Sequence, residues 1–225
     1  LKITTPSNWL KEASASSVMM NRFAHQQVRN GLDTSIFRVY DKAAARDILG
    51  LDTSKKIVLF VAATLAETRK GFSLLMQAME QLGEENEYPN LQLLCLGAMR
   101  QPINFPNMVN LGAISDERLM ALAYAAADAL VLPSLEDNLP NTMLEALCCG
   151  TPVAAFNRGG MAEEIENGTN GWLSDAPTVE GLKEAMRQFL TQPLQHNTQQ
   201  ISATAHARFN DKVLVENYLE VYRSF

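Results

Sequence analysis

A continuous apolar run at residues 56–63, KIVLFVAA, constrains the fold of this chain more than any other feature. Large and β-branched residues without polar alternation are typical of a strand buried on both faces, as in a parallel sheet covered by helices. The residues that follow, 70–82, carry apolar side chains at helical spacing. These are Phe72, Leu75, Met76, Met79 and Leu82. Together the two patterns predict a β-strand followed by a helix that covers it.

The same alternation continues along the chain. Further strands are predicted at residues 91–97, 108–111, 129–132, 152–156 and 171–173. Helices are predicted at 140–147, at 161–166 and after Ser115, which we expect to cap a helix with acidic residues in its first turn. Repeated βα units predict an α/β fold with a Rossmann-like, doubly wound parallel sheet flanked by helices. Such sheets bind ligands beyond the carboxyl ends of their strands, so chemistry is sought in the loops there.

The alternating region is flanked by two parts of different character. We divide the chain into a lead-in segment from an inter-domain region (1–50), a Rossmann-like domain (51–190) and C-terminal helices (191–225). In the lead-in segment, Ser7 is predicted to cap a helix, residues 29–31 to form a turn, and residues 42–49 to form a second helix. Thr178 is predicted to cap the last helix of the central domain.

Composition excludes several classes of protein. The formal net charge of -6 argues against a general nucleic-acid binder, because affinity for phosphate backbones needs a basic surface. No apolar run is long enough to span a bilayer. The cysteines, Cys95, Cys148 and Cys149, lack zinc-ligand spacing, so we expect a reducing cytosol. Cys148 and Cys149, at the end of a predicted helix, are expected to be packed thiols. The histidines have no neighbouring cysteine or acidic pair, and no metal site is predicted.

The loop after the first buried strand carries two basic residues, Arg69 and Lys70, at the predicted start of a helix. A helix N-terminus presents free backbone N–H groups and a partial positive charge. Added cations there favour binding of a phosphate or diphosphate. A solvated basic turn is the alternative interpretation of this loop on its own.

The loop after the 129–132 strand gathers acidic and amide residues before the next helix. Asp137 lies in this loop and Glu145 inside the helix, and both can face one cleft. Carboxylates accept hydrogen bonds from sugar and ribose hydroxyls. Alternatively, Asp137 caps the helix and Glu145 is a surface charge. After the next strand, Gly159 and Gly160 permit either close backbone approach to a ligand or a tight turn.

In combination, these loops resemble the C-terminal domain of family 4 glycosyltransferases, retaining enzymes with the GT-B fold. The resemblance extends from about residue 5 to 189. It rests on the segments TPSNWL, NGLDTSIF, RKGFSLL, LGAISDERL, ADALVLPSLEDNLPNTMLEALCCGTPVAAF and GGMAEEIENGTNGWL, which occur in the family's order. G-x-G-x-x-G, P-loop and G-x-S-x-G motifs are absent from the sequence, which removes the common alternatives for such a sheet.

The resemblance implies that this domain holds a nucleoside diphosphate sugar. Lys70 would bind the diphosphate, Asp137 the sugar hydroxyls, and Glu145 the ribose. The last two occupy the acidic positions of the family's E-x7-E motif and, with Lys70, are the predicted catalytic residues. The remaining implied contacts come from backbone amides near the sugar, phosphate and base, at Asn138, Leu139, Asn141, Thr142, Ala113 and Ile114. No metal and no cofactor is implied, because basic groups would replace the divalent ion.

Three departures from the family pattern stand out. Asp137 replaces the usual Glu, with Glu136 beside it, so either carboxylate could serve. The family places an arginine near the end of the first strand, where this chain has residues 63–65, Ala-Thr-Leu; we expect Arg69 to substitute for it. The acceptor domain, with its glycine-rich loop and histidine, is not in this sequence, so we expect a fragment that binds donor weakly and transfers nothing.

The implied whole enzyme moves a sugar from a nucleoside diphosphate to an acceptor hydroxyl with retention, in polysaccharide or glycan synthesis. Its partners would be the donor and the N-terminal acceptor domain, with no nucleic acid. Peripheral contact with the inner face of the membrane, through that domain, stays open for an otherwise cytoplasmic protein. Two alternatives from other classes remain: a GT-B nucleotide-sugar epimerase, and a non-catalytic nucleotide-sugar-binding module.

Overall fold

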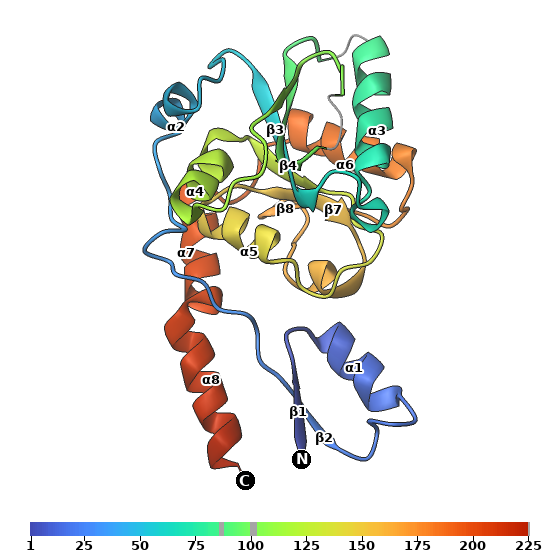
Figure 1. The fold of residues 1–225 in the computed structure, drawn as a ribbon, viewed down its shortest axis with the longest axis vertical. Helices are drawn as coiled ribbons and strands as arrows, with labels where there is room; N and C mark the ends of the chain where they lie inside the picture. The colour runs from blue at the N-terminus through green and yellow to red at the C-terminus, as the bar shows by residue number, and fades with distance from the viewer. Residues whose placement is uncertain (86–87, 100–102, 225) are drawn as a thin grey trace.

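The fold is described from a computed structural model, which covers residues 1–85, 88–99 and 103–224. Its centre is a parallel sheet, seen in the upper part of Figure 1. The sheet has six strands in the order β5-β4-β3-β6-β7-β8. The strands are β3 (Lys56–Thr64), β4 (Leu91–Ala98), β5 (Met108–Asn110), β6 (Ala129–Leu132), β7 (Val153–Phe156) and β8 (Gly171–Ser174). Every strand predicted from the sequence is present, and the doubly wound α/β prediction is confirmed.

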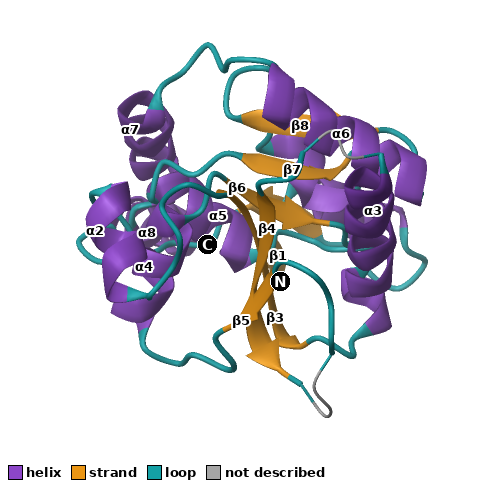
Figure 2. Ribbon diagram, turned by 90° about the horizontal axis from the view of Figure 1, so that it is seen from above, coloured by secondary structure: helices purple, strands orange, loops and turns teal. Residues whose placement is uncertain are grey.

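Helices cover both faces of this sheet (Figure 2). One face is covered by α3 (Phe72–Glu84) and α6 (Val179–Thr191). The other is covered by α2 (Lys42–Ile48), α4 (Glu117–Ala126), α5 (Asn141–Cys148) and α7 (Thr198–Phe209). The sheet is therefore the middle layer of three, and each face has its own hydrophobic cluster.

Strand β3 shows why the apolar run is continuous. Ile57 and Leu59 point into the cluster under α4 and α5, whereas Val58 and Phe60 point into the cluster under α3 and α6. All four side chains are at most 1% exposed. Because successive side chains of a strand alternate between faces, a strand with helices on both sides needs an apolar residue at every position.

The lead-in segment contains a small sheet that the sequence did not predict. Strands β1 (Lys2–Thr5) and β2 (Ala24–Gln27) pair in parallel, joined by α1 (Asn8–Ser16). The Ser7 cap is confirmed: its side chain accepts a hydrogen bond from the amide of Leu10 at 3.1 Å. The turn predicted at residues 29–31 is wrong, because the chain there is irregular and leads to a bridge between Leu32 and Asn210.

The last helix, α8 (Asp211–Arg223), runs beside the small sheet, and both ends of the chain lie at this end of the molecule (Figure 1). Lys2 Nζ donates to Ser224 Oγ at 2.6 Å. Residue 225, the predicted end of the C-terminal helices, lies outside the described residues.

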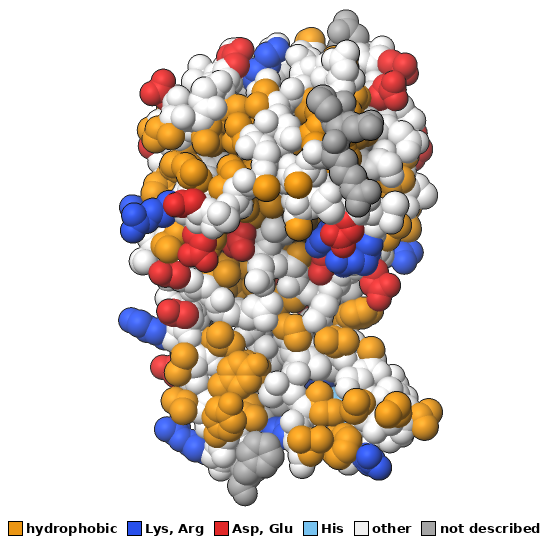
Figure 3. Space-filling view, in the orientation of Figure 1, with side chains coloured by type: hydrophobic (Ala, Val, Ile, Leu, Met, Phe, Trp, Pro, Cys, Tyr) orange, Lys and Arg blue, Asp and Glu red, His pale blue; other side chains and the backbone are white. Residues whose placement is uncertain are grey.

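Hydrophobic side chains gather on the lower part of the molecule, where α8, α1 and the small sheet lie (Figure 3). The large exposed ones in the lead-in segment and α8 are Leu1, Trp9, Val18, Met19, Met20, Ile48, Val215, Leu219 and Tyr222, of which Ile48 lies in α2, away from this part.

Several predicted helix ends are shifted. The cap of α4 is Asp116, whose side chain accepts from two amides, and not Ser115. Residues 161–166 do not form an α-helix; a 3-10 turn, η2 (Gly159–Glu163), stands there instead. Thr178 caps α6 as predicted.

In the part of the chain that the structure describes, no helix is long and apolar enough to cross a membrane.

Candidate functional site

The candidate site lies beyond the carboxyl ends of β3 and β6. These strands are neighbours, and from them the sheet is built outward in opposite directions, through β4 and β5 on one side and β7 and β8 on the other. The loops that leave such a pair diverge and create a crevice, where doubly wound sheets bind ligands. The basic turn at Arg69 and Lys70 follows β3, and the acidic loop with Asp137 follows β6.

The basic turn differs from the helix start that we predicted. Arg69 and Lys70 belong to a 3-10 turn, η1 (Thr68–Lys70), and α3 begins only after Gly71, at Phe72. Gly71 has a φ of 71°, and a Cβ there would lie 1.9 Å from the carbonyl oxygen of Pro133. Only glycine permits this left-handed conformation together with such close contact. The two loops therefore pack directly against each other.

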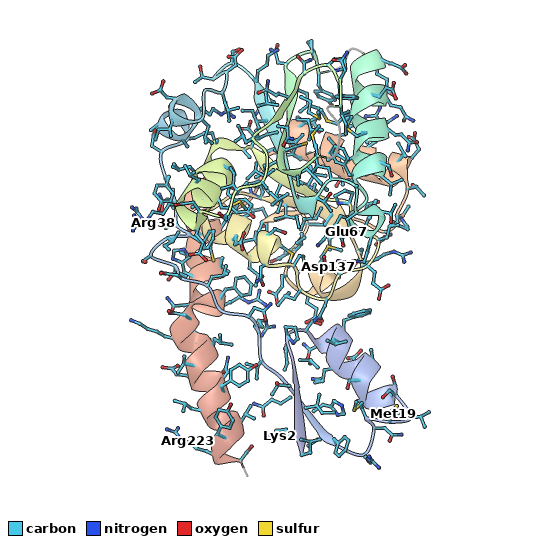
Figure 4. The ribbon with its side chains drawn as sticks, in the orientation of Figure 1. Lys2, Met19, Arg38, Glu67, Asp137 and Arg223 are labelled. Atoms are coloured by element: carbon cyan, nitrogen blue, oxygen red, sulfur yellow. The ribbon has the colours of Figure 1, made fainter. Side chains whose placement is uncertain are left out.

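Lys70 and Asp137 form an ion pair across the two loops. Lys70 Nζ lies 2.6 Å from Asp137 Oδ2, with 19% and 13% of the two side chains exposed. Arg69 approaches the same carboxylate at 3.6 Å. Figure 4 shows Asp137 near Glu67, on the underside of the main body. The structure thus brings together Arg69, Lys70 and Asp137, and Asp137 does not cap α5.

Arg69 is held in place by groups from both loops. Its guanidinium donates to the carbonyl oxygen of Glu136 at 2.9 Å and to Glu67 Oε1 at 2.8 Å. The carbonyl oxygen of Arg69 in turn accepts from the amide of Leu135 at 3.0 Å. Residues 63–65, where the family pattern has an arginine, lie at the end of β3 and are Ala-Thr-Leu in this chain. The guanidinium next to Lys70 is therefore that of Arg69, in η1.

Glu145 lies on α5, in a partly enclosed position. Its Oε2 accepts a hydrogen bond from the hydroxyl of Tyr124, on α4, at 2.7 Å. Burial raises the pKa of Glu145; the bond from Tyr124 lowers it and the charge of Glu117 adds to the rise. Glu145 is therefore not a surface charge. Glu145 is hydrogen-bonded to α4, whereas Asp137 is paired with the basic turn η1, so the two acidic residues of the motif contact different elements.

The N-terminus of α5 supplies polar groups beside the acidic loop. The first amides of a helix have no partner within it, and here they belong to Asn141 and Thr142. Thr142 Oγ1 is buried and has no hydrogen-bond partner among the described residues. A buried hydroxyl without a partner costs free energy. Its position beside the free amides fits a ligand with acceptor oxygens.

The remaining predicted residues are placed separately. Asn138 Oδ1 accepts from Ser7 Oγ at 2.5 Å, and Asn141 Oδ1 accepts from Asn30 Nδ2 at 2.8 Å. Leu139 is buried in the core. Ala113 and Ile114 lie in the loop after β5, beyond the same edge of the sheet, and no hydrogen bond of theirs to the other candidates is seen among the described residues.

The glycine pair contacts the acidic loop. A Cβ on Gly159 would lie 1.9 Å from the carbonyl oxygen of Asp137, and one on Gly160 would lie 1.7 Å from that of Asn138. The glycines therefore allow two backbones to meet, which fixes the loop. The sequence did not predict this contact between the glycines and the acidic loop. It also did not predict that Tyr124 bonds to Glu145 or that Ser7 bonds to Asn138. The signals for the last two were weak, because both look like ordinary core and cap residues.

Among residues 1–85, 88–99 and 103–224, no group of three or more His, Cys, Asp or Glu side chains could hold a metal ion. The three thiols are buried. Burial raises the pKa of both Cys95 and Cys148 to about 12 and that of Cys149 further still. Since the thiolate is the reactive form, these cysteines are not nucleophiles at neutral pH.

Comparison with known proteins gives consistent matches. A model of the family described as "Glycosyl transferases group 1" matches residues 41–207. D-inositol 3-phosphate glycosyltransferase from Segniliparus rotundus is 29% identical over 208 residues, covering 86% of this chain and 45% of that protein. The Rhodococcus jostii protein of the same name is 28% identical over 212 residues, covering 87% and 46%. The chain therefore spans just under half the length of these relatives.

Solved structures share the fold. Sucrose-phosphate synthase from Thermosynechococcus elongatus superimposes with a TM-score of 0.84 at 24% identity, covering 99% of this chain and 58% of that one. HepE from Anabaena, in complex with UDP-glucose, superimposes with a TM-score of 0.78 at 19% identity, covering 99% and 63%. This likeness confirms that the chain has the Rossmann-like architecture of one half of a GT-B fold.

Proposed function

Because the chain belongs to the group 1 glycosyltransferase family, we propose that it is the donor-binding half of a retaining glycosyltransferase. The whole enzyme moves a sugar from a nucleoside diphosphate sugar to an acceptor hydroxyl. The observation that carries this proposal is the position of Arg69, Lys70 and the α5 N-terminus beyond the carboxyl ends of β3 and β6, the two strands from which the sheet is built outward in opposite directions. The UDP-glucose complex of HepE supports the class of ligand.

The diphosphate is the part of the donor that this site fits best. Lys70 and Arg69 supply positive charge, and the amides of Asn141 and Thr142 donate hydrogen bonds from the helix N-terminus. Charge builds up on the diphosphate as the sugar bond breaks, so these groups stabilise the transition state as well as the bound donor. No metal is required in this scheme.

The carboxylates serve the neutral parts of the donor. When the diphosphate takes Lys70, the carboxylate of Asp137 is free to accept hydrogen bonds from sugar hydroxyls. Glu145, on the helix behind, accepts from the ribose. The amides near Asn138 and Leu139 complete the sugar and phosphate contacts, and those of Ala113 and Ile114 meet the base.

A second domain completes the enzyme in this proposal. The relatives are about twice as long as the matched region, which leaves room for a domain that holds the acceptor. We propose that this domain brings a histidine and a glycine-rich loop to the sugar, that it makes any membrane contact, and that the product is a glycan or polysaccharide. The buried free thiols favour a cytoplasmic location.

The test is calorimetric titration of this chain with UDP and GDP. Saturable binding of one of them identifies the base, and the variants Lys70→Ala and Glu145→Ala should lose it. Lys212→Ala, on an exposed position of α8, is the matched control and should bind like the wild type. Absence of nucleotide binding by a folded sample would reject the donor site and favour a non-catalytic scaffold.

Incubation with the donor separates the enzymatic alternatives. We expect this chain alone to transfer no sugar, because the acceptor side of the cleft is not part of it. Detectable transfer to an added polyol would overturn that expectation. Release of an epimerised nucleotide sugar would show that the chain is an epimerase on the same architecture.

A further inference from the structure

Tyr124 is completely buried between two helices, and its hydroxyl has a carboxylate as its partner. The residue belongs to α4 and is 0% exposed. Its hydroxyl donates to Glu145 Oε2, on α5, at 2.7 Å. A buried phenol hydroxyl needs an acceptor, but backbone carbonyl oxygens usually provide it. Here the acceptor is the residue assigned above to the ribose of the donor.

Packing alone does not explain the hydroxyl. The ring of Tyr124 meets that of Phe37 edge-to-face at 6.5 Å between centroids, and a phenylalanine would make the same contact. The hydroxyl adds a hydrogen bond to an enclosed carboxylate. The other ionisable groups that interact electrostatically with this carboxylate are Glu117 and the thiols of Cys148 and Cys149. None of these three groups is positively charged. Among the described side chains, only the phenol of Tyr124 donates a hydrogen bond to Glu145.

The phenol is itself fixed in position. The carbonyl oxygen of Tyr124 accepts from Thr151 Oγ1 at 2.8 Å and from the amide of Ala127 at 3.1 Å. Thr151 lies three residues after the end of α5, so Tyr124 is bonded to α5 through its hydroxyl and to the segment just after α5 through its backbone. A glutamate carboxylate turns freely about its last torsion unless something holds one oxygen. With Oε2 held, the direction of Oε1 is set.

We propose that Tyr124 is a positioning residue for nucleotide recognition: it holds Glu145 so that Oε1 accepts a hydrogen bond from a ribose hydroxyl of the donor. This inference rests on the proposed function, because it takes the ribose as the ligand of Glu145. It assigns to α4, which otherwise covers the sheet, a role in distinguishing ribose from deoxyribose.

The experiment compares UDP with its 2′-deoxy and 3′-deoxy forms by calorimetry, or the GDP series if GDP is the nucleotide bound. Wild type should bind the natural nucleotide about tenfold more tightly than one of the deoxy forms, the value for one hydrogen bond to a charged group. Tyr124→Phe should lose most of this ratio by weakening only the natural nucleotide. Tyr40→Phe is the matched control, because its hydroxyl bonds to the carbonyl oxygen of Ile36 at 2.9 Å, and it should keep the ratio.

A second variant tests the same point with Tyr124 unchanged. In Glu145→Gln, the phenol should donate to the amide oxygen and turn the NH2 group toward the ribose, which lowers the ratio. A full wild-type ratio in this variant, or in a folded Tyr124→Phe, would overturn the proposal. If Glu145→Ala still binds the nucleotide and keeps the ratio, the ribose assignment itself is wrong. If wild type binds neither nucleotide, the proposed function fails and the inference falls with it.

Discussion

At the scale of single residues, the ion pair between Lys70 and Asp137 has the clearest consequence for ligand binding. Both side chains are more than four-fifths buried, so the pair is less screened by water than an exposed one. In the donor site that we propose, a diphosphate would compete with Asp137 for the ammonium group of Lys70. We therefore expect the carboxylate to oppose binding of the bare nucleotide and to favour a ligand that also brings a sugar.

Asp137→Asn tests this competition. The variant should bind UDP (or GDP) a few-fold more tightly than wild type, because the ammonium group of Lys70 no longer has to leave a carboxylate to reach the diphosphate. It should also lose preference for the nucleotide sugar over the bare nucleotide. Glu136→Gln, which removes the neighbouring exposed carboxylate, is the control. If this variant, and not Asp137→Asn, loses the preference for the nucleotide sugar, Glu136 is the residue that binds the sugar. If Asp137→Asn weakens binding of the bare nucleotide, the competition does not exist.

Arg69→Ala tests whether this guanidinium replaces the arginine that the family places nearer to β3. Its side chain is 49% exposed and within reach of the same carboxylate as Lys70. Nucleotide affinity should fall by about 1–2 kcal/mol, the lower part of the range for a hydrogen bond to a charged group, because the side chain is half-exposed. Calorimetry at low and moderate salt measures it, with Arg118→Ala, at an exposed position of α4, as the control. Unchanged affinity would remove Arg69 from the site.

Glu145 predicts a pH dependence of stability. Burial raises its pKa above the ordinary 4.5, despite the bond from Tyr124. A carboxyl with a higher pKa in the folded state stabilises the protein below the unfolded pKa, and this contribution is lost as pH rises through the folded value. Glu145→Gln does not titrate. Urea unfolding between about pH 4 and 8 should therefore show wild type losing stability relative to Glu145→Gln as pH rises; a constant difference would contradict this.

At the scale of elements, the sequence predicted the central sheet well because burial on both faces leaves a strong apolar pattern, as in β3. It predicted helix ends less well: Asp116 and Ser115 are both good caps, and only the backbone decides between them. The small sheet of β1 and β2 was missed because β2, Ala24–Gln27, is polar and half-exposed. The site residues could be named from motifs, but the Lys70–Asp137 pairing comes from loops that meet only in three dimensions.

The contact between η2 and the acidic loop leads to a prediction at this scale. In Gly160→Ala the new Cβ would meet the carbonyl oxygen of Asn138, so one backbone must move. We expect a loss of about 1–3 kcal/mol in the free energy of unfolding, the range for overpacking, together with weaker nucleotide binding. Gly83→Ala, in α3 with open space around it, is the control and should be neutral or slightly stabilising. Urea titration and calorimetry measure both effects.

At the scale of the whole molecule, distant parts of the chain are tied together next to the site. The carboxylate of Glu164, whose side chain is 0% exposed, pairs with Arg29 at 2.8 Å and Arg208 at 2.5 Å. It thereby joins the segment after β2 and the end of α7 to the residues that follow the glycine pair. Glu163 accepts from the amides of Asn8 and Trp9, at the start of α1. The lead-in unit is thus attached to the same segment that supports the acidic loop.

The two hydrophobic clusters share one sheet, so we expect them to unfold together. Cys95 belongs to the cluster under α3 and α6, whereas Cys148 belongs to the one under α4, α5 and α7. Burial raises the pKa of both thiols to about 12, so neither should react with a thiol reagent in the native protein at neutral pH. Labelling in increasing urea, followed by mass spectrometry of the peptides, reports each cluster separately. Because removing either layer exposes the same strands to water, both thiols should become reactive at one urea concentration. Reaction of Cys95 well before Cys148 would show instead that the sheet can lose the α3 and α6 layer while the layer that carries Tyr124 and Glu145 stays folded.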